Sequence, residues 1–166
     1  AKNTLNDQIE GMETGADAYI TKPFSIQLLN TSIVQLIRTR QKLFAHFSKD
    51  VYMLPGQLAK NDLDKDFLEN VIRIIHENIT DNQLSVELLA NQLNLSRSNI
   101  YRKIKALTGN TIIEFIRIIR LKFALQLMES KKHSLSEIAY LCGFSSPSYF
   151  TKRFKEHYGK PPSEFM

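Results

Sequence analysis

The sequence holds a single cysteine, Cys142, in 166 residues. One cysteine excludes an internal disulfide framework and a cysteine metal cluster. Long apolar runs are also missing, because none approaches the roughly 20 residues needed to span a bilayer. We expect this segment to lie in the cytoplasm. This holds even if the parent protein is anchored in the inner membrane. The sequence does not begin with Met, and we expect it to be a piece of a longer chain.

Motifs for catalysis are absent. The four histidines share no metal-ligand spacing, and no Gly-rich phosphate loop, paired acid motif or nucleophile elbow occurs. Cys142 lies in an apolar stretch, so we expect a buried core residue rather than a nucleophile. We therefore expect no enzyme activity, no metal and no cofactor in this chain, and leave open a histidine kinase elsewhere in a longer parent. The histidines are His46, His76, His133 and His157.

Acidic residues are missing from one short stretch in particular. The chain has a formal net charge of +5 and a pI of about 9.3. Residues 97–105 contain four Lys or Arg and no Asp or Glu. Ile100, Ile104 and Leu107 recur there at helical spacing. The pattern predicts a helix with one buried stripe and one cationic face.

The chain contains an internal repeat. Residues 88–116, "LLANQLNLSRSNIYRKIKALTGNTIIEFI", match residues 137–166, "EIAYLCGFSSPSYFTKRFKEHYGKPPSEFM". The offset is 49 up to Ser96 and Ser145, and one extra residue then enters at Ser146–Pro147. Each copy predicts a short helix with a central alanine, a tight turn, and a second, basic helix that ends at a glycine. The matched pairs are Ala90 with Ala139, Leu95 with Phe144, Ile100 with Phe150, Lys103 with Arg153, Ile104 with Phe154, Lys105 with Lys155, Gly109 with Gly159 and Phe115 with Phe165.

This plan is the helix-turn-helix, whose second helix enters the DNA major groove. A helix over 111–130 should connect the two copies, with capping boxes at Thr111–Glu114 and Ser134–Glu137. About 20 residues at 1.5 Å each give about 30 Å. This is close to one DNA turn of about 34 Å. Two reading helices could therefore reach successive major grooves.

The outward faces of the two basic helices carry the candidate DNA contacts. Arg can bind guanine and Asn can bind adenine in the major groove. Lys and Ser suit phosphate oxygens. Helix phase alone does not separate base contacts from phosphate contacts. The candidates are Arg97, Ser98, Asn99, Tyr101, Arg102 and Lys105 in the first helix, and Ser146, Ser148, Thr151, Lys152 and Lys155 in the second.

Residues 66–166 resemble the AraC/XylS-type DNA-binding domain. The resemblance rests on "LANQLNLSRSNIYRKIKALTG", "IRLKFALQLM" and "EIAYLCGFSSPSYFTKRFKEHYGKPPSEF". It implies a mainly α fold, a bundle of about seven helices with two helix-turn-helix motifs joined by a long helix. Double-stranded DNA is the implied partner, and RNA polymerase is a further one. The resemblance assigns recognition to Arg97, Ser98, Tyr101 and Arg102, and to Ser148, Thr151 and Lys152.

The N-terminal part has a different pattern. Residues 5–14 read as a helix, residues 18–21 as a short strand, and Ser25 caps a long helix that reaches about Phe47. We expect this strand to lack its sheet partners in this chain, so that it is irregular or pairs across a dimer. Its apolar residues could pack on their own domain, or pair with a second copy in a homodimer through residues 25–47. Residues 48–65 read as a linker, followed by a helix from about Asp64 to Asn78. The apolar seam is Ile26, Leu29, Ile33, Leu36, Leu43 and Phe47, interrupted by Arg40.

Residues 1–47 resemble the C-terminal end of a response-regulator receiver domain. The motif is "GMETGADAYITKPF", which is similar to the fourth helix, the last strand and the loop after it. By this resemblance Tyr19 is the switch aromatic, Lys22 contacts the phosphorylated aspartate, and the Lys22–Pro23 bond is cis. The phosphorylated aspartate itself is absent from this sequence. The resemblance implies upstream receiver or kinase domains, as in a response regulator or a hybrid two-component sensor.

Together these features predict a receiver remnant at 1–47, a linker at 48–65 and a double helix-turn-helix domain at 66–166. The predicted function is sequence-specific DNA binding in a transcription regulator of a two-component phosphorelay. The alternative is a dimerisation module of a signalling protein with only non-specific affinity for DNA. RNA binding is a third option, but no aromatic stacking platform of the usual kind is present.

Overall fold

The computed structural model describes residues 18–49, 59 and 61–166. These residues form seven α-helices, one short 3-10 helix and no strand. The mainly α prediction is therefore confirmed. The helix predicted at 5–14 lies outside the described residues.

Helix α2 (Ile26–Lys49) begins where the sequence predicts. The hydroxyl oxygen of Ser25 accepts a hydrogen bond from the Leu28 amide at 3.1 Å, which caps the first turn. The predicted strand at 18–21 is wrong, because these residues form irregular backbone. A single extended segment without a neighbouring strand in the described chain has no ladder partner for its amides. The Lys22–Pro23 bond is cis, as the receiver resemblance implies.

Three helices form the first unit, α3 (Asp62–Glu77), α4 (Val86–Leu93) and α5 (Arg97–Thr108). The side chain of Asn61 caps α3, which begins at Asp62, two residues before the predicted start. The apolar face of α3, which includes Leu68, Val71 and Ile75, is buried, as is the predicted stripe of α5. Ala90 on α4 is also buried, so a small side chain lies where α5 crosses α4.

The second unit follows the long helix α6 (Ile112–Ser130) and consists of α7 (Leu135–Leu141), α8 (Pro147–Tyr158) and the 3-10 segment η2 (Pro162–Glu164). The capping box at Ser134 and Glu137 is complete. The box predicted at Thr111 is only half formed. Thr111 accepts from the Glu114 amide at 3.2 Å, but the Glu114 carboxylate pairs with Arg117 at 2.9 Å, one helical turn further on.

The domain has two separate hydrophobic cores that divide along α6. The first core contains the buried side chains of α3, α4 and α5 with α6 residues as far as Ile119. The second core begins at Leu121 and contains the buried side chains of α7 and α8. Partly buried Phe123 packs against both. The long helix is thus the main structural link between the two units.

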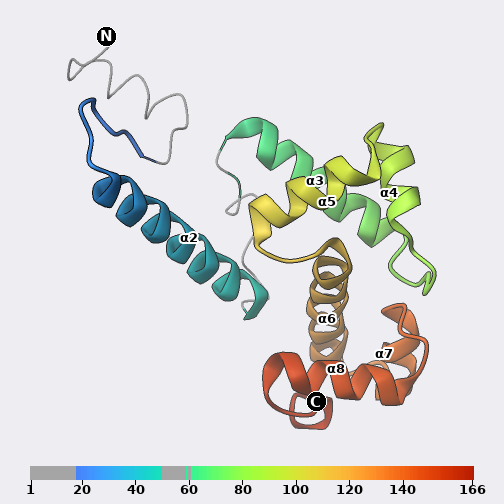
Figure 1. The fold of residues 1–166 in the computed structure, drawn as a ribbon. Coiled ribbons are helices and arrows are strands. Elements are labelled where there is room, and N and C mark those ends of the chain that lie inside the picture. The colour runs from blue at the N-terminus through green and yellow to red at the C-terminus, as the bar shows by residue number, and fades with distance from the viewer. Residues whose placement is uncertain (1–17, 50–58, 60) are drawn as a thin grey trace.

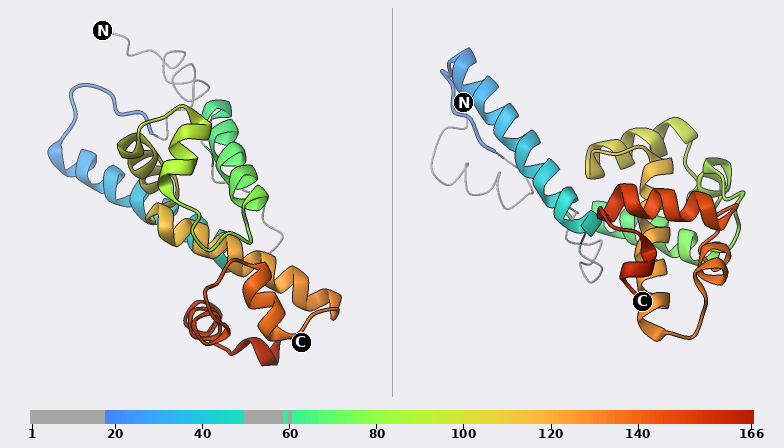
Figure 2. Two further views of the ribbon diagram at one scale, coloured as in Figure 1. Left: turned by 90° about the vertical axis from the view of Figure 1, so that its right-hand side faces the viewer. Right: turned by 90° about the horizontal axis from the view of Figure 1, so that it is seen from below.

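The C-terminal end of α2 belongs to the first core. Phe44 and Phe47 are buried, and the Phe47 ring stacks on Phe115 of α6 with 6.3 Å between centroids. The ammonium group of Lys122 lies 3.5 Å from the Phe47 ring centroid. The N-terminal part of α2 instead leaves the domain as a rod (Figures 1 and 2). Of the two readings of its apolar seam, packing on the chain's own domain is confirmed for this C-terminal end.

Figure 1 shows α5 and α8 running in similar directions, separated along α6, which lies between them. In the left view of Figure 2, which is turned by 90° from Figure 1, both helices are seen nearly end-on towards the same side of the molecule. Helix α6 has 19 residues, so it is about 28 Å long at 1.5 Å per residue. The fold therefore presents two similar helices from one side of a single long helix.

Candidate nucleic-acid interface

Each helix-turn-helix unit turns at a residue with positive φ. Asn94 has φ of 51° after α4, and Gly143 has φ of 70° after α7. The recognition helices then begin at serine caps, since Ser96 accepts from the Asn99 amide and Ser146 accepts from the Tyr149 amide. The sequence comparison placed the extra residue of the second copy at Ser146–Pro147, and the structure corrects this position. The cap at Ser146 corresponds to Ser96, and the additional residue of the second copy is Ser145.

The first recognition helix exposes every candidate residue named from the sequence. Its buried stripe faces α4 and α6, so helical phase leaves the cationic side in solvent. Tyr101 is 44% exposed, which is high for a large aromatic side chain. The exposed set is Arg97, Ser98, Asn99, Tyr101, Arg102 and Lys105.

The second recognition helix also exposes its candidate residues, with the exception of Ser146. Ser148, Thr151, Lys152 and Lys155 are exposed, whereas Ser146 is half buried and caps the helix. Phe150 and Phe154 are fully buried in the stripe on the opposite side. The Ser146 hydroxyl accepts from the Tyr149 amide at 3.3 Å, so its first role is structural.

The three exposed cations of α5 already have partners within the chain. Nη1 of Arg97 donates to Oε1 of Glu87 on α4 at 2.6 Å. Nη2 of Arg102 donates to Oδ1 of Asn99 at 2.8 Å. Nζ of Lys105 donates to the carbonyl of Gly109 at 2.7 Å, which satisfies the end of its own helix. A DNA contact by Arg97 or Lys105 therefore competes with a partner in the protein.

The Arg97–Glu87 pair is exposed, with more than half of each side chain in solvent. A backbone hydrogen bond, followed by the hydrogen bond from Arg97, lowers the pKa of the Glu87 carboxyl. The carboxylate thus stays ionised beside the recognition helix at neutral pH. Because the pair is exposed, it is weakened by salt and can be broken by a competing phosphate.

Two further cations of the repeat stabilise the units themselves. Lys103 lies 3.4 Å from Asp64 and over the Phe67 ring, so it ties α5 to α3. Its counterpart Arg153 pairs with Glu156 at 2.8 Å and lies over the ring of Tyr149. The match between Lys103 and Arg153 in the repeat therefore reflects a structural role rather than a reading role.

Sequence reasoning missed residues around a cavity of about 460 Å³ between the two units. Its lining includes Tyr149, which is 38% exposed in the first turn of α8, and Arg117 and Arg120 from α6. The repeat pairs Tyr149 with Asn99, an assigned contact, so that alignment could have identified it. No signal in the sequence placed the α6 arginines, because α6 is apolar along most of its length.

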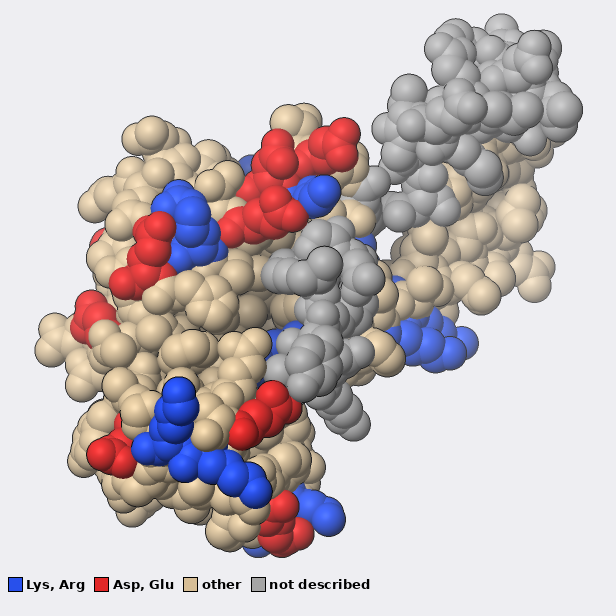
Figure 3. Space-filling model, turned by 180° about the vertical axis from the view of Figure 1, so that it is seen from behind, with Lys and Arg blue, Asp and Glu red and all other residues tan. Residues whose placement is uncertain are grey.

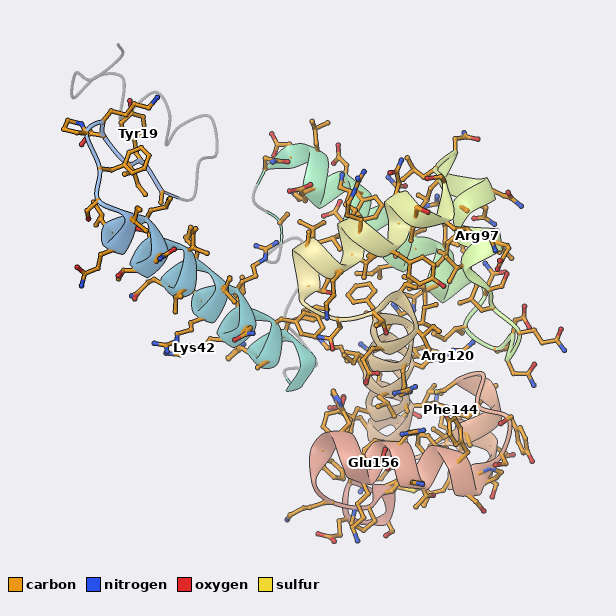
Figure 4. The ribbon with its side chains drawn as sticks, in the orientation of Figure 1. Tyr19, Lys42, Arg97, Arg120, Phe144 and Glu156 are labelled. Carbon is orange, nitrogen blue, oxygen red and sulfur yellow. The ribbon has the colours of Figure 1, made fainter. Side chains whose placement is uncertain are left out.

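The remaining candidate groups have ordinary structural roles. Cys142 is buried, and burial raises the pKa of its thiol to about 12. No cluster of three His, Cys, Asp or Glu side chains suited to a metal occurs among residues 18–49, 59 and 61–166. Tyr19 and Lys22 precede α2, and Figure 4 places Tyr19 at the far end of that helix from the two units. None of the described helices is both long enough and apolar enough to cross a membrane.

Figure 3 shows the molecule from behind, where Asp and Glu side chains lie beside Lys and Arg on both units. Helix α5 carries no acidic residue, and the one acid of α8, Glu156, is paired with Arg153. The exposed sides of the two recognition helices therefore carry Lys and Arg without an unpaired acid.

Two similar helix-turn-helix units on one long helix define a double helix-turn-helix domain. Residues 89–166 match the family model of the helix-turn-helix domain. A crystal structure of a transcriptional regulator with an AraC-type DNA-binding domain, from Chromobacterium violaceum, superposes with a TM-score of 0.58 at 27% identity. The alignment covers 63% of this chain and 93% of that one. Residues 89–166 therefore match the helix-turn-helix domain, and this part of the chain is similar to AraC-type DNA-binding domains.

Two curated relatives extend the match beyond this domain. Histidine kinase P4 from Formosa agariphila is 36% identical over 166 residues, which is all of this chain and 12% of that protein. The Msm operon regulatory protein from Streptococcus mutans is 38% identical over 145 residues, which is 84% of this chain and 51% of that protein. The chain thus spans about half or less of the length of these two relatives.

Proposed function

We propose that this chain is the DNA-binding output part of a bacterial transcription regulator, and that it reads two successive major grooves of one duplex. The observation that carries the proposal is the arrangement of α5 and α8, which expose their polar, cationic sides towards one side of α6. The similarity to an AraC-type DNA-binding domain and to an operon regulatory protein supports it. A spacer of about 28 Å suits grooves about 34 Å apart, since the reading helices extend beyond its ends.

The first recognition helix supplies most of the base reading. Arg102 projects from the exposed side of α5, and its fork can donate two bonds to guanine O6 and N7. Asn99 holds Arg102 by a 2.8 Å hydrogen bond, which limits the side-chain freedom lost on binding. Tyr101 and Ser98 lie on the same exposed surface and suit thymine methyl and phosphate contacts.

The second recognition helix grips the backbone. Lys152 and Lys155 are point charges suited to phosphate, and Ser148 and Thr151 are short donors. Its reading of bases is therefore weaker than that of α5. RNA polymerase remains a further partner in this proposal, at a surface that lies outside the two recognition helices.

The segment before the domain is the end of a receiver domain in a two-component phosphorelay. The relative that covers the whole chain is a histidine kinase of which the match spans only 12%, and this supports a parent with further signalling domains. The proposed boundaries are 1–47 for the receiver remnant, 48–65 for the linker and 66–166 for the DNA-binding domain. Tyr19 and Lys22 keep the roles that the receiver resemblance assigns to them.

A homodimer forms through residues 25–47 in this proposal. The N-terminal half of α2 exposes apolar side chains at heptad spacing, with Ile26 76% and Ile33 45% exposed. Exposed apolar side chains in an a/d pattern are typical of a helix that pairs with a second copy. Sedimentation equilibrium tests this. The seam is supported if the unaltered chain is a dimer and the Ile33→Lys variant is a monomer. It is contradicted if the unaltered chain is a monomer at millimolar concentration.

Selection of bound duplexes from a random pool, followed by a salt titration, tests the proposed function. A regulator yields an enriched sequence motif, and its affinity falls steeply with salt, with a slope of about −0.9 per neutralised phosphate. Enrichment without a motif would favour the alternative, a dimerisation module with non-specific affinity. Self-association that is independent of salt, with no affinity for duplex DNA, would exclude DNA binding altogether.

A further inference from the structure

Arg120 lies at the boundary between the two hydrophobic cores. Its neighbours on α6 belong to different cores, Ile119 to the first and Leu121 to the second. Figure 4 shows Arg120 between the upper unit and Phe144 of the lower unit. No other arginine on α6 occupies this boundary, since Arg117 lies one turn earlier and pairs with Glu114. Besides Phe123, which packs against both cores, Arg120 is therefore placed to fix the two units relative to one another.

The guanidinium of Arg120 contacts the first unit at its α3–α4 turn. Nη2 donates to the carbonyl oxygen of Asp81 at 2.5 Å, across 39 residues of sequence. The Asp81 carboxylate attracts the same cation, while burial of the group lowers its pKa. Nε of Arg120 is buried and has no hydrogen-bond partner among the residues that the structure describes.

The same guanidinium packs against the second unit at Gly143. A Cβ atom placed on Gly143 would lie 2.8 Å from Nη2 of Arg120 and would collide with the carbonyl oxygen of Ile79. Gly143 also has φ of 70°, a conformation that side chains disfavour. The turn of the second unit therefore approaches both the α3–α4 turn and Arg120 at a distance that only glycine permits.

A cavity of about 460 Å³ lies beside this contact, between the two units. Arg120, Gly143 and Phe144 all belong to its lining, as do Ser85 and Glu87 of the first unit. Because the two cores are separate and a cavity lies between the units, few direct contacts resist a change in their relative angle. The junction of Arg120, Gly143 and the α3–α4 turn is the polar contact that does so.

We infer that Arg120 is a positioning residue that sets the separation and angle of the two recognition helices, and thereby the spacing between the two DNA half-sites. A half-site here is the segment read by one unit. The inference rests on the proposed reading of two successive grooves. One inserted base pair rotates a half-site by about 35° and moves it by about 3.4 Å, so a rigid pair of units must reject it.

The test uses the 166-residue chain and a duplex selected by the unaltered protein. Affinity is measured for the selected site, for sites with one base pair inserted or removed between the half-sites, and for an isolated half-site. We expect the unaltered chain to lose about 30-fold or more on the altered spacings. Arg120→Met should reduce that loss to about 5-fold or less, with half-site affinity changed by less than about 2-fold.

A matched control separates positioning from general stability. Arg73→Met removes an exposed arginine that pairs with Glu77 on α3, and it should leave the spacing dependence unchanged. If Arg120→Met does not fold, Arg120→Lys keeps the charge and the aliphatic stem but loses the fork, and the same relaxation is expected. A folded variant that still rejects altered spacings, or that loses half-site affinity by the same factor, overturns the inference. A lack of paired half-sites for the unaltered chain instead contradicts the proposed function.

Discussion

Nη1 of Arg97 lies 2.6 Å from Oε1 of Glu87, and this pair joins the start of the recognition helix α5 to the helix before it. The pair orients an arginine whose assigned role is DNA contact, and it also places a carboxylate beside the duplex. The net effect on binding is measurable, because phosphate and Glu87 compete for the same guanidinium.

Glu87→Gln should strengthen DNA binding. Removing the carboxylate frees Arg97 and removes repulsion from phosphate, so affinity at low salt should rise several-fold and the salt slope should become steeper by up to about one phosphate. Fluorescence anisotropy at several salt concentrations measures both. Glu77→Gln, from the similar pair with Arg73 on α3, is the control. Equal changes in the two variants would argue against a role for Glu87 at the interface.

Arg102→Ala should cost about 1–3 kcal/mol of binding free energy and relax the preference at one base pair. Lys155→Ala should instead weaken all sequences alike and reduce the salt slope. Repeating the selection with each variant distinguishes the two roles. Unchanged affinity and site preference in Arg102→Ala would refute the base contact, and sequence-dependent losses in Lys155→Ala would refute the phosphate contact.

The positions of the helices could be predicted from the sequence because each has its own local signal. Ser25 and Ser134 cap their helices as predicted, and the buried stripe of α5 follows the 3.6-residue period. The strand at 18–21 does not form, because an extended segment without a neighbouring strand has no pairing partner. Helix phase predicted which residues of α5 and α8 are exposed, whereas the contacts of Arg120 were missed because they involve two turns distant in sequence.

Phe47→Ala should destabilise the domain by about 3 kcal/mol, because the ring is 1% exposed and stacks on Phe115. The result would show that the upstream helix α2 is energetically part of the first core. Urea unfolding measures the change in free energy. Leu63→Ala, at a side chain 77% exposed on α3, should change it by less than about 0.5 kcal/mol. Similar values for the two variants would contradict the docking of α2.

Glu137 should make the domain sensitive to acid. The backbone amide of Ser134 and then its hydroxyl bind the Glu137 carboxylate and lower its pKa below the ordinary 4.5. The folded state therefore gains stability from the carboxylate above pH 4.5, and this gain is lost as pH falls towards the lower pKa of the folded chain. Glu137→Ala should thus cost stability at pH 7 and less at pH 3. A cost that does not vary with pH, or one shared by the exposed Glu69→Ala, would contradict this.

Cys142 should react slowly in the folded chain. The thiol is buried, and its pKa of about 12 leaves very little thiolate at neutral pH. Maleimide labelling at pH 7.5, followed by mass spectrometry, should be slow in buffer and rapid in denaturing urea. Rapid labelling of the native chain would show that the second turn opens readily or that Cys142 is not a core residue.

The central claim is that α5 and α8 bind neighbouring major grooves on one side of a duplex at the same time. Methylation interference on a selected site at low salt tests this most directly, because guanine N7 lies in the major groove. The account predicts two clusters of interfering guanines about one helical turn apart on the same face. A single cluster, or none, would contradict it.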